Sequence, residues 1–265
     1  MISKTILKSF LFCSIFTWTA TSEAYIPPSF YVVRMLAKKH SSVKNGVVIK
    51  HKLSFFKKNG DTDQVFTETI FIKENQDVTI QVQEQDQSLL YIFKRSLEDN
   101  LKLRPLLYDL LFLSDGTKVF NYFKKLGLPL KTEKELQTEK MEGQNYVIEK
   151  FLSLSRIENR IAITINKNDA VASLLPTPSL WIEKDSFLPL KAAWDQFEFQ
   201  FSSYYVYENG FLYPRNIHVL KNNTLWFKLE TIELTLKKSM DSIKIPENNQ
   251  DSFSEPFDLY FKWIR

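Results

Sequence analysis

The side chains that most often bind metals are few and scattered in this sequence. Its three histidines, His40, His51 and His218, lie far apart, and none has the spacing of a metal-binding motif. His218 alternates with Ile217 and Val219, so we expect its ring to face solvent. The histidines therefore predict no metal site.

Motifs for nucleophiles and for phosphate binding are also missing from the sequence. The six glycines stand apart near predicted turns, so they form neither a phosphate-binding loop nor a dinucleotide-binding fingerprint. No G-x-S-x-G pentapeptide occurs, and the one cysteine, Cys13, lies in the N-terminal apolar segment. We therefore predict that the protein is not an enzyme, has no catalytic residues and needs no cofactor.

Acidic side chains are so common that close pairs arise by chance. Glu183 and Asp185 flank a predicted turn, and Asp195 precedes Glu198 at the start of a predicted strand. A general acid and base would also need burial and matched partners. A secreted hydrolase that uses Glu183 and Asp195 is the enzymatic alternative.

The N-terminal segment has the features of a secretory signal peptide. Lys4 and Lys8 precede a short apolar stretch at 9–18, and Ser-Glu-Ala at 22–24 provides small residues before a cleavage site. The apolar stretch is shorter than the ~20 residues that cross a bilayer, and an uncleaved anchor is the alternative. We predict a signal peptide at 1–24 and export to the periplasm, with secretion as the other destination.

Residues 25–265 are predicted to form a single domain held together by a hydrophobic core. No cysteine follows Cys13, so no disulfide stabilises this part. The formal charge is only +4 and basic groups alternate with acidic ones, which does not favour binding to nucleic acid. The chain has 22 phenylalanines, more than a sheet with one wet face usually needs. We expect a monomer.

Alternation of apolar and polar residues predicts a large antiparallel sheet. In 77–83 and 160–166, valine or isoleucine occupies every second position, which is typical of strands with one dry face. Turn-forming pairs such as Asn209-Gly210 separate many of these runs. About eleven strands are predicted, at 47–56, 65–72, 77–83, 88–94, 146–152, 160–166, 179–184, 188–194, 197–207, 211–220 and 225–236. The run 257–263 is predicted as a further edge strand.

The last long strand is predicted to bend. Within 225–236, the apolar residues move from odd positions, ending at Leu229, to even positions, starting at Ile232. A parity change of this kind inside a strand predicts a β-bulge.

Helical spacing of apolar residues predicts what covers the sheet. An amphipathic helix is expected over 30–39 with Ser29 as its N-cap, and two short helices over 106–111 and 119–126. The polar segment 131–143 is expected to be an exposed loop. The fold class is therefore mainly β with α (α+β): a strongly curved antiparallel sheet, or incomplete β-barrel, of about eleven strands covered by an N-terminal helix and a helical insertion.

A curved sheet of this size has a concave face that side chains or a ligand must fill. A cavity lined by aliphatic and aromatic side chains suits an acyl chain, because burial of each methylene yields ~0.8 kcal/mol. We predict a hydrophobic ligand-binding cavity with a wall, a cover and a movable lid. The predicted wall is Val78, Ile80, Val82, Ile161, Ile163, Ile165, Phe197, Phe199 and Phe201; the cover is Val32, Met35 and Leu36; the lid is Leu106, Leu110 and Phe120.

Two hairpins in the second half resemble those of a known family. SLWIEKDSFLPLK at 179–191 is similar to the x-W-I-D-x-x-T-x-L-P-x-R hairpin of the lipoprotein-localisation carriers, the periplasmic outer-membrane lipoprotein-sorting proteins. Gly210, Tyr213-Pro214 and Ile217 resemble the G-x-x-Y-P-x-x-I run of the next hairpin in that family. The segment 231–237 resembles its late strand. Before Ser179, only the order of elements is similar.

This resemblance implies a half-barrel whose internal cavity takes up lipid chains. The implied partners are a lipid acyl chain or a lipoprotein, or an envelope protein complex. The family's carriers hold their lid closed with an inward arginine early in the sheet, whereas 47–56 contains Lys50 and Lys52 but no arginine. We predict a periplasmic binding or carrier protein in outer-membrane lipoprotein sorting. The alternative is a non-transporting envelope sensor or scaffold that uses the same fold for protein–protein interaction.

Overall fold

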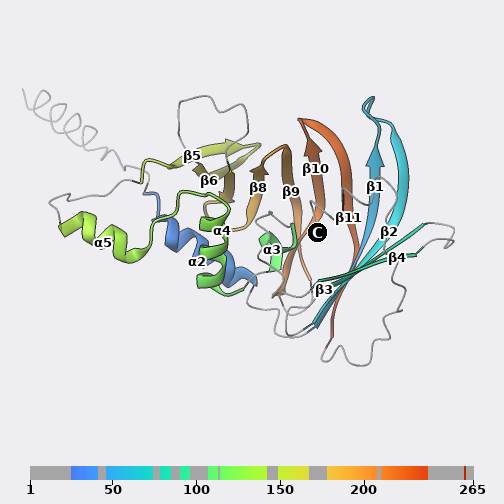
Figure 1. Cartoon of the computed structure of the whole chain (residues 1–265), viewed down its shortest axis with the longest axis horizontal. Helices are drawn as coiled ribbons and strands as arrows, with labels where there is room; N and C mark the ends of the chain where they lie inside the picture. Colours follow the sequence, from blue (N-terminus) through green and yellow to red (C-terminus); the bar gives the residue numbers. More distant parts are fainter. Residues whose placement is uncertain are drawn as a thin grey trace, which may run out of the picture.

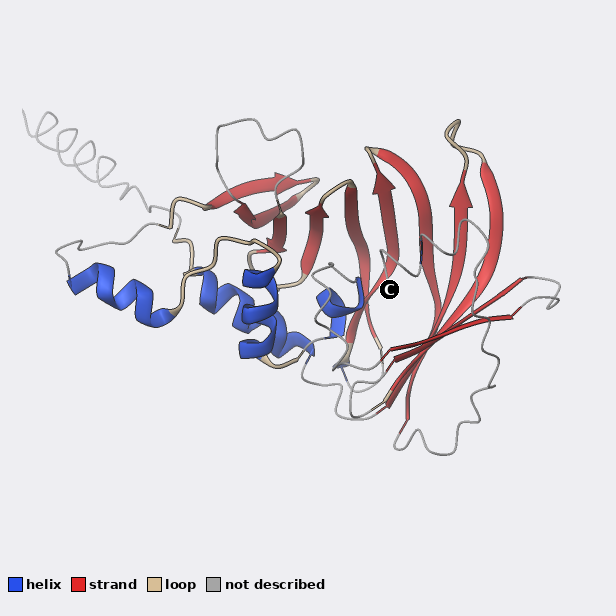
Figure 2. Cartoon of the chain, viewed as in Figure 1, coloured by secondary structure: helices blue, strands red, loops and turns tan. Residues whose placement is uncertain are grey.

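The fold is built around one large antiparallel sheet with a few helices (Figures 1 and 2). The computed structural model describes residues 25–40, 46–73, 78–84, 90–95, 107–112, 114–141, 149–166, 178–207, 210–237 and 260. The predicted signal peptide, the predicted lid residue Leu106 and Asn209 lie outside these residues. Of the predicted strand 257–263, only Tyr260 is described, and its backbone is helical.

The predicted number of strands and the open form of the sheet are confirmed. The strands lie in the order β4-β3-β2-β1-β11-β10-β9-β8-β7-β6-β5, and β4 and β5 form its two ends. Each neighbouring pair is antiparallel. The strand bounds are β1 (Gly46–Phe56), β2 (Thr62–Ile72), β3 (Val78–Glu84), β4 (Leu90–Arg95), β5 (Leu152–Ile157), β6 (Arg160–Asn166), β7 (Ser179–Glu183), β8 (Pro189–Trp194), β9 (Phe197–Val206), β10 (Leu212–Lys221) and β11 (Thr224–Lys237).

Four helices accompany the sheet in the described part of the chain. They are α2 (Ser29–His40), α3 (Leu107–Phe112), α4 (Gly116–Lys125) and α5 (Glu133–Met141). Helix α3 lies near β9 and β10, in the middle of the sheet (Figure 1). Helix α2 packs against α4, and both lie with α5 near the β5–β8 end, whereas β1–β4 curve away at the opposite end (Figure 1). Among the described residues, no helix has the length and apolar character needed to cross a membrane.

Two predictions of local structure are wrong, and hydrogen bonds explain both. Residues 133–141 of the predicted loop 131–143 form α5, because Thr132 and Glu135 form a capping box that starts this helix. Thr132 Oγ1 accepts from the Glu135 amide at 3.2 Å, and Glu135 Oε2 accepts from the Thr132 amide at 2.5 Å. Of the strand predicted over 146–152, residues 146–148 lie outside the described residues, 149–151 are not strand, and β5 begins at Leu152. Glu149 lies outside the sheet ladder because its carboxylate binds the start of α2.

The predicted β-bulge in β11 is confirmed. Lys50 pairs with Glu233 and His51 with Thr231, so Ile232 is an extra residue between the two pairs. Its side chain is 62% exposed, and the inward positions pass from Leu229 and Thr231 to Leu234. Ile232 therefore does not belong to the inner even-numbered set to which the pattern assigned it.

Candidate functional site

The inner face of the sheet is a largely apolar wall. Most residues predicted to line a cavity lie in one hydrophobic cluster with the helices; these are Val32, Leu36, Val78, Ile80, Val82, Leu110, Phe120, Ile163, Ile165, Phe197, Phe199 and Phe201. Met35 is half-buried. Ile161 lies beside the β5–β6 turn, where it is 46% exposed and outside the cluster.

Five buried polar side chains interrupt this wall, and we call them the polar belt. Glu68 on β2, His51 on β1, Thr231 on β11 and Tyr213 on β10 come from four strands that are neighbours in the sheet, and Tyr260 joins them from outside it. Thr231 is 5% exposed and the other four are fully buried. Polar groups that are buried this deeply destabilise the fold unless they form hydrogen bonds.

The hydrogen bonds of the polar belt form a chain. His51 Nδ1 lies 2.8 Å from Glu68 Oε2, and His51 Nε2 lies 3.2 Å from the Tyr213 hydroxyl. The Tyr260 hydroxyl donates to Glu68 Oε1. With Glu68 as a carboxylate, Nδ1–H donates to Oε2 and the Tyr213 hydroxyl donates to Nε2, so each contact has one donor and one acceptor.

Strand register brings these residues together. His51 lies opposite Glu68 across β1 and β2, and opposite Thr231 across β1 and β11. Thr231 has the same inward parity as Leu229, up to the bulge at Ile232, and its Oγ1 donates to the Pro214 carbonyl at 2.8 Å. The polar belt is thus a cross-strand row on the inner face of the sheet.

Aromatic rings fix the two tyrosines. The Tyr213 ring stacks on His51 and on Phe112 of α3, with centroids 5.8 and 5.5 Å apart. The Tyr260 ring meets Phe55 and Phe227 edge to face, at 6.0 and 5.1 Å. Tyr260 is therefore held both by its hydroxyl and by its ring.

The chain from the Tyr213 hydroxyl through the His51 imidazole to the Glu68 carboxylate contains the same functional groups as the catalytic triad of a hydrolase. Solvent reaches none of Tyr213, His51 and Glu68 in this structure. The acids named for the hydrolase alternative, Glu183 and Asp195, lie at opposite ends of β8. Among the described residues, no group of three or more His, Cys, Asp or Glu is placed to hold a metal ion.

The polar belt was not predicted from the sequence, although part of its signal is present there. Glu68 occupies the same strand face as Phe66 and Ile70, and His51 the same face as Ile49 and Leu53. A charged or polar residue on the dry face of an alternating strand indicates a buried polar site. In β1, where no inward arginine was found, the inward polar side chain is His51.

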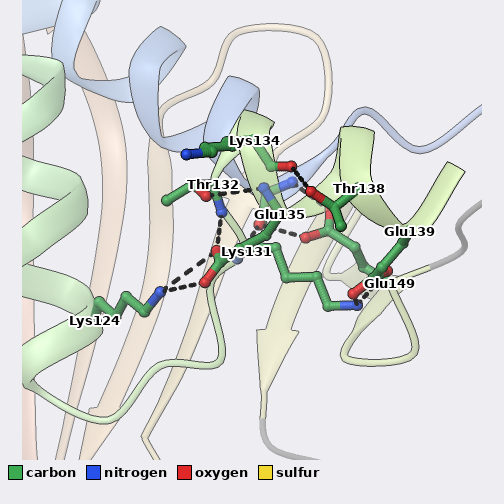
Figure 3. Close-up of polar contacts among 9 residues, drawn as sticks. Lys124, Lys131, Thr132, Lys134, Glu135, Thr138, Glu139 and Glu149 are labelled. Carbon is green, nitrogen blue, oxygen red and sulfur yellow. Dashed lines mark hydrogen bonds and ion pairs between the residues drawn. The ribbon is translucent and has the colours of Figure 1, made fainter. Parts of the chain in front are cut away.

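A second polar cluster anchors the helices (Figure 3). Glu149 accepts hydrogen bonds from the Ser29 amide at 2.7 Å and the Ser29 hydroxyl at 2.6 Å, so Glu149 rather than Ser29 satisfies the start of α2. Lys131 binds Glu139 of α5 at 2.6 Å. Lys124 of α4 lies 3.1 Å from Glu135 of α5. These contacts hold α2, α4 and α5 together.

The two anchoring acids have opposite pKa shifts. Burial raises the pKa of Glu149 above its ordinary 4.5, and the two hydrogen bonds from Ser29 oppose this only in part. The backbone and side-chain hydrogen bonds with Thr132, helped by Lys124, lower the pKa of Glu135 to about 2. On the outer face of β10, His218 is half-buried, and burial together with Lys228 lowers its pKa.

No protein-family model matches the sequence, and no curated protein matches it. Among solved structures, the chain is similar to an outer-membrane lipoprotein-sorting protein domain from Vibrio parahaemolyticus, with 9% identity and a TM-score of 0.43 over 80% of this chain and 93% of that one. A LolA superfamily protein from Nitrosomonas europaea has 10% identity and a TM-score of 0.41, over 81% and 95%. A DUF1329 family protein from Desulfovibrio piger has 11% identity and a TM-score of 0.40, over 82% and 96%. The first two carry the names of the family that the hairpin motifs resemble.

Proposed function

We propose that this protein is a periplasmic carrier that holds the acyl chain of a lipid or lipoprotein against the inner face of its sheet. The observation that supports the proposal is the extent of the apolar wall, which includes buried aliphatic side chains of β1–β3 as well as those of the strands nearer the helices. There Val82, Ile80 and Val78 form one aliphatic row, and Ile70 and Ile72 of β2 form the next.

The energetics of an acyl chain fit a wall of this kind. A chain of about ten methylenes supplies about 8 kcal/mol when it is buried, before ordering costs. Such a carrier needs no covalent chemistry, because the hydrophobic effect alone retains the chain.

Native mass spectrometry of protein purified from its own host tests this proposal. We expect a bound adduct with the mass of a lipid. A second test measures the affinity for a fluorescent acyl probe in two variants. Val82→Phe places a larger side chain on the wall, and Val206→Phe, at a site that is 57% exposed, is the control. We expect only the wall variant to bind more weakly, and equal affinities would contradict the proposal.

A protein-binding module is the second candidate, and one observation favours it. Tyr205 and Val206 at the end of β9 are 60% and 57% exposed, and the Tyr205 ring packs on Tyr207 with centroids 5.0 Å apart. Exposed aromatic side chains are enriched at protein interfaces. Protein from the host that carries no lipid but co-purifies with a stable protein partner, lost in Tyr205→Ser, would favour this candidate over the carrier.

A further inference from the structure

We propose that one edge of the sheet docks on the surface of an anionic lipid bilayer, with tyrosine and aliphatic side chains at the interface and arginines on the lipid phosphates. The inference rests on the proposed function, because a carrier of acyl chains must meet the bilayer that supplies or receives them. We call this surface the apolar edge. It consists of described residues beside the β5–β6, β7–β8 and β9–β10 turns: Tyr31, Arg156, Ile161, Tyr205, Val206 and Arg215.

The topology of the sheet places these three turns together. Strands β5 to β11 follow one another both in the chain and in the sheet, and each neighbouring pair is antiparallel. Successive turns of such a meander lie at alternate edges, so the turns after β5, β7 and β9 share one edge and the turns after β8 and β10 share the other. At that other edge the turn residues are polar: Asp195-Gln196 and Asn222-Asn223.

The large exposed apolar side chains of the described strands all lie toward the apolar edge. Ile161 is the second residue of β6, and Tyr205 and Val206 are the last two residues of β9; they are 46%, 60% and 57% exposed. Ile232, which is 62% exposed, lies in the second half of β11, and this strand runs toward the same edge. Large apolar groups that share one edge indicate an interaction surface, whereas single scattered ones are ordinary.

Helix α2 adds an aromatic ring to the same edge. Tyr31, in the first turn of α2, is 41% exposed, and its ring meets Phe187 of the β7–β8 turn edge to face, with centroids 6.0 Å apart. The apolar edge is therefore formed by three hairpins and the start of a helix.

Arginines accompany these apolar groups. Arg156 lies opposite Ile161 across β5 and β6. Burial raises the pKa of the Tyr207 hydroxyl, and Arg215 on β10 is near enough to oppose that rise. Both arginines are exposed, and no carboxylate in the described part of the chain forms an ion pair with either. Their guanidinium groups are therefore available to an anionic partner.

The chemistry of the apolar edge fits a bilayer. Tyrosine suits the boundary between acyl chains and head groups, because its ring is apolar and its hydroxyl is polar. Guanidinium groups bind phosphate oxygens with two parallel hydrogen bonds. The apolar groups lie on separate hairpins, and a fluid interface accepts separate tips without a matching shape. The exposed acids Glu158 and Asp185 keep the net charge of the edge low, so docking needs the apolar groups as well as the arginines.

Sedimentation with sucrose-loaded vesicles of equimolar phosphatidylethanolamine and phosphatidylglycerol tests the docking. Arg215→Gln should bind about fivefold more weakly than the parent protein, the effect of one cationic side chain at an anionic surface. The double variant Tyr205→Ser with Val206→Ser should bind at least about tenfold more weakly, because it removes apolar area from the interface. The control Lys58→Gln removes an exposed charge from the β1–β2 turn and should bind like the parent protein. All four positions are exposed, so the variants should fold.

The outcomes separate this inference from the proposed function. Parent protein that stays in the supernatant, or apolar-edge variants that sediment like the parent protein, would overturn the inference. So would a host protein that binds the parent protein and not the double variant while neither sediments, because the edge would then be a protein interface. The carrier is tested independently by the acyl probe, whose affinity should be the same in the parent protein and in these variants. Absence of probe binding would refute the carrier, a failure that differs from loss of sedimentation.

Discussion

His51 on β1 and Glu68 on β2 face each other directly across the sheet, with 2.8 Å between Nδ1 and Oε2, and solvent reaches neither side chain. One residue away on the same strand, Lys50 pairs with Glu233 at the same distance, 2.8 Å, but with side chains that are 46% and 52% exposed. The two pairs thus have the same distance between their charged or polar atoms, but one is buried and the other is exposed to solvent.

This contrast predicts very different effects of mutation. His51→Ala should lower the free energy of unfolding by about 3–5 kcal/mol, because it removes the partner of Glu68 Oε2 at a site that solvent does not reach. Lys50→Ala, the control, should cost about 0–1 kcal/mol, since exposed ion pairs contribute little. Urea denaturation measures both losses, and similar values at the two pairs would contradict the burial of His51 and Glu68.

The bulge in β11 predicts a second contrast, between two apolar residues two positions apart. Leu234→Ala should cost about 2–5 kcal/mol, because Leu234 is only 6% exposed and truncation leaves a cavity. Ile232→Ala should change stability by no more than about 0.5 kcal/mol, because Ile232 is 62% exposed. Thermal or urea unfolding of both variants checks this, and a larger loss for Ile232→Ala would place the bulge elsewhere.

The capping box of α5 predicts a local effect. Thr132→Ala should lower the stability of α5 by about 1 kcal/mol, because it removes the acceptor for the Glu135 amide. Glu133→Ala, which changes an exposed acid in the same turn, is the control and should have little effect. Hydrogen exchange of the α5 amides measures the difference, and equal exchange rates in both variants would argue against the box.

Glu135 should also titrate abnormally. The bonds from Thr132 hold its pKa at about 2, below the ordinary 4.5, so its contribution to stability is present above pH 4.5 and is lost as the pH falls toward 2. Carbon-13 NMR of the side-chain carboxyl should find its midpoint near 2. In Thr132→Ala the midpoint should move up toward 4.5, and a midpoint that does not move would exclude Thr132 as the cause.

Glu149 should show the opposite dependence. Burial raises its pKa, so the folded state binds the proton more tightly than the unfolded state. Its contribution is then complete below pH 4.5 and is lost as the pH rises through the folded pKa. As the pH rises from 4 to 7, the free energy of unfolding of the parent protein should therefore fall relative to that of Glu149→Gln. Urea denaturation of both proteins at a series of pH values measures this difference. A difference that does not change with pH would contradict the shift.

Local patterns were sufficient to predict most of the sheet. Strands such as β2 and β9 have one dry face, so hydrophobic alternation identified them directly, and the parity change in 225–236 revealed the bulge. The edge strand β5 was misplaced because the apolar residues of 146–152 favoured an earlier start, and its own alternation of leucine and serine at 152–155 was not used. Helix α5 was missed because its apolar residues are few, although the sequence Thr132-Glu133-Lys134-Glu135 contained the capping signal.

The polar belt required information that the sequence does not contain. Parity alone puts His51 and Glu68 on the inner face, but their contact depends on the register between β1 and β2. Tyr213 and Tyr260 reach them only through the three-dimensional arrangement of segments 162 and 192 positions apart. Contacts of such separation leave no local pattern to read.

The pairing of β1 with β11 also determines at which step of folding the inner face is completed. It joins two meanders, β1–β4 and β5–β11, whose own contacts are mostly between successive hairpins. Gly46 of β1 lies opposite Lys237 of β11, far away in the sequence. The β1–β11 pairing therefore has a high entropic cost of loop closure and should form last. Pulsed hydrogen exchange during refolding would find its amides protected after those of the hairpins. The complete inner wall, and with it the proposed cargo surface, should thus form in the final folding step, because the wall extends across the β1–β11 pairing.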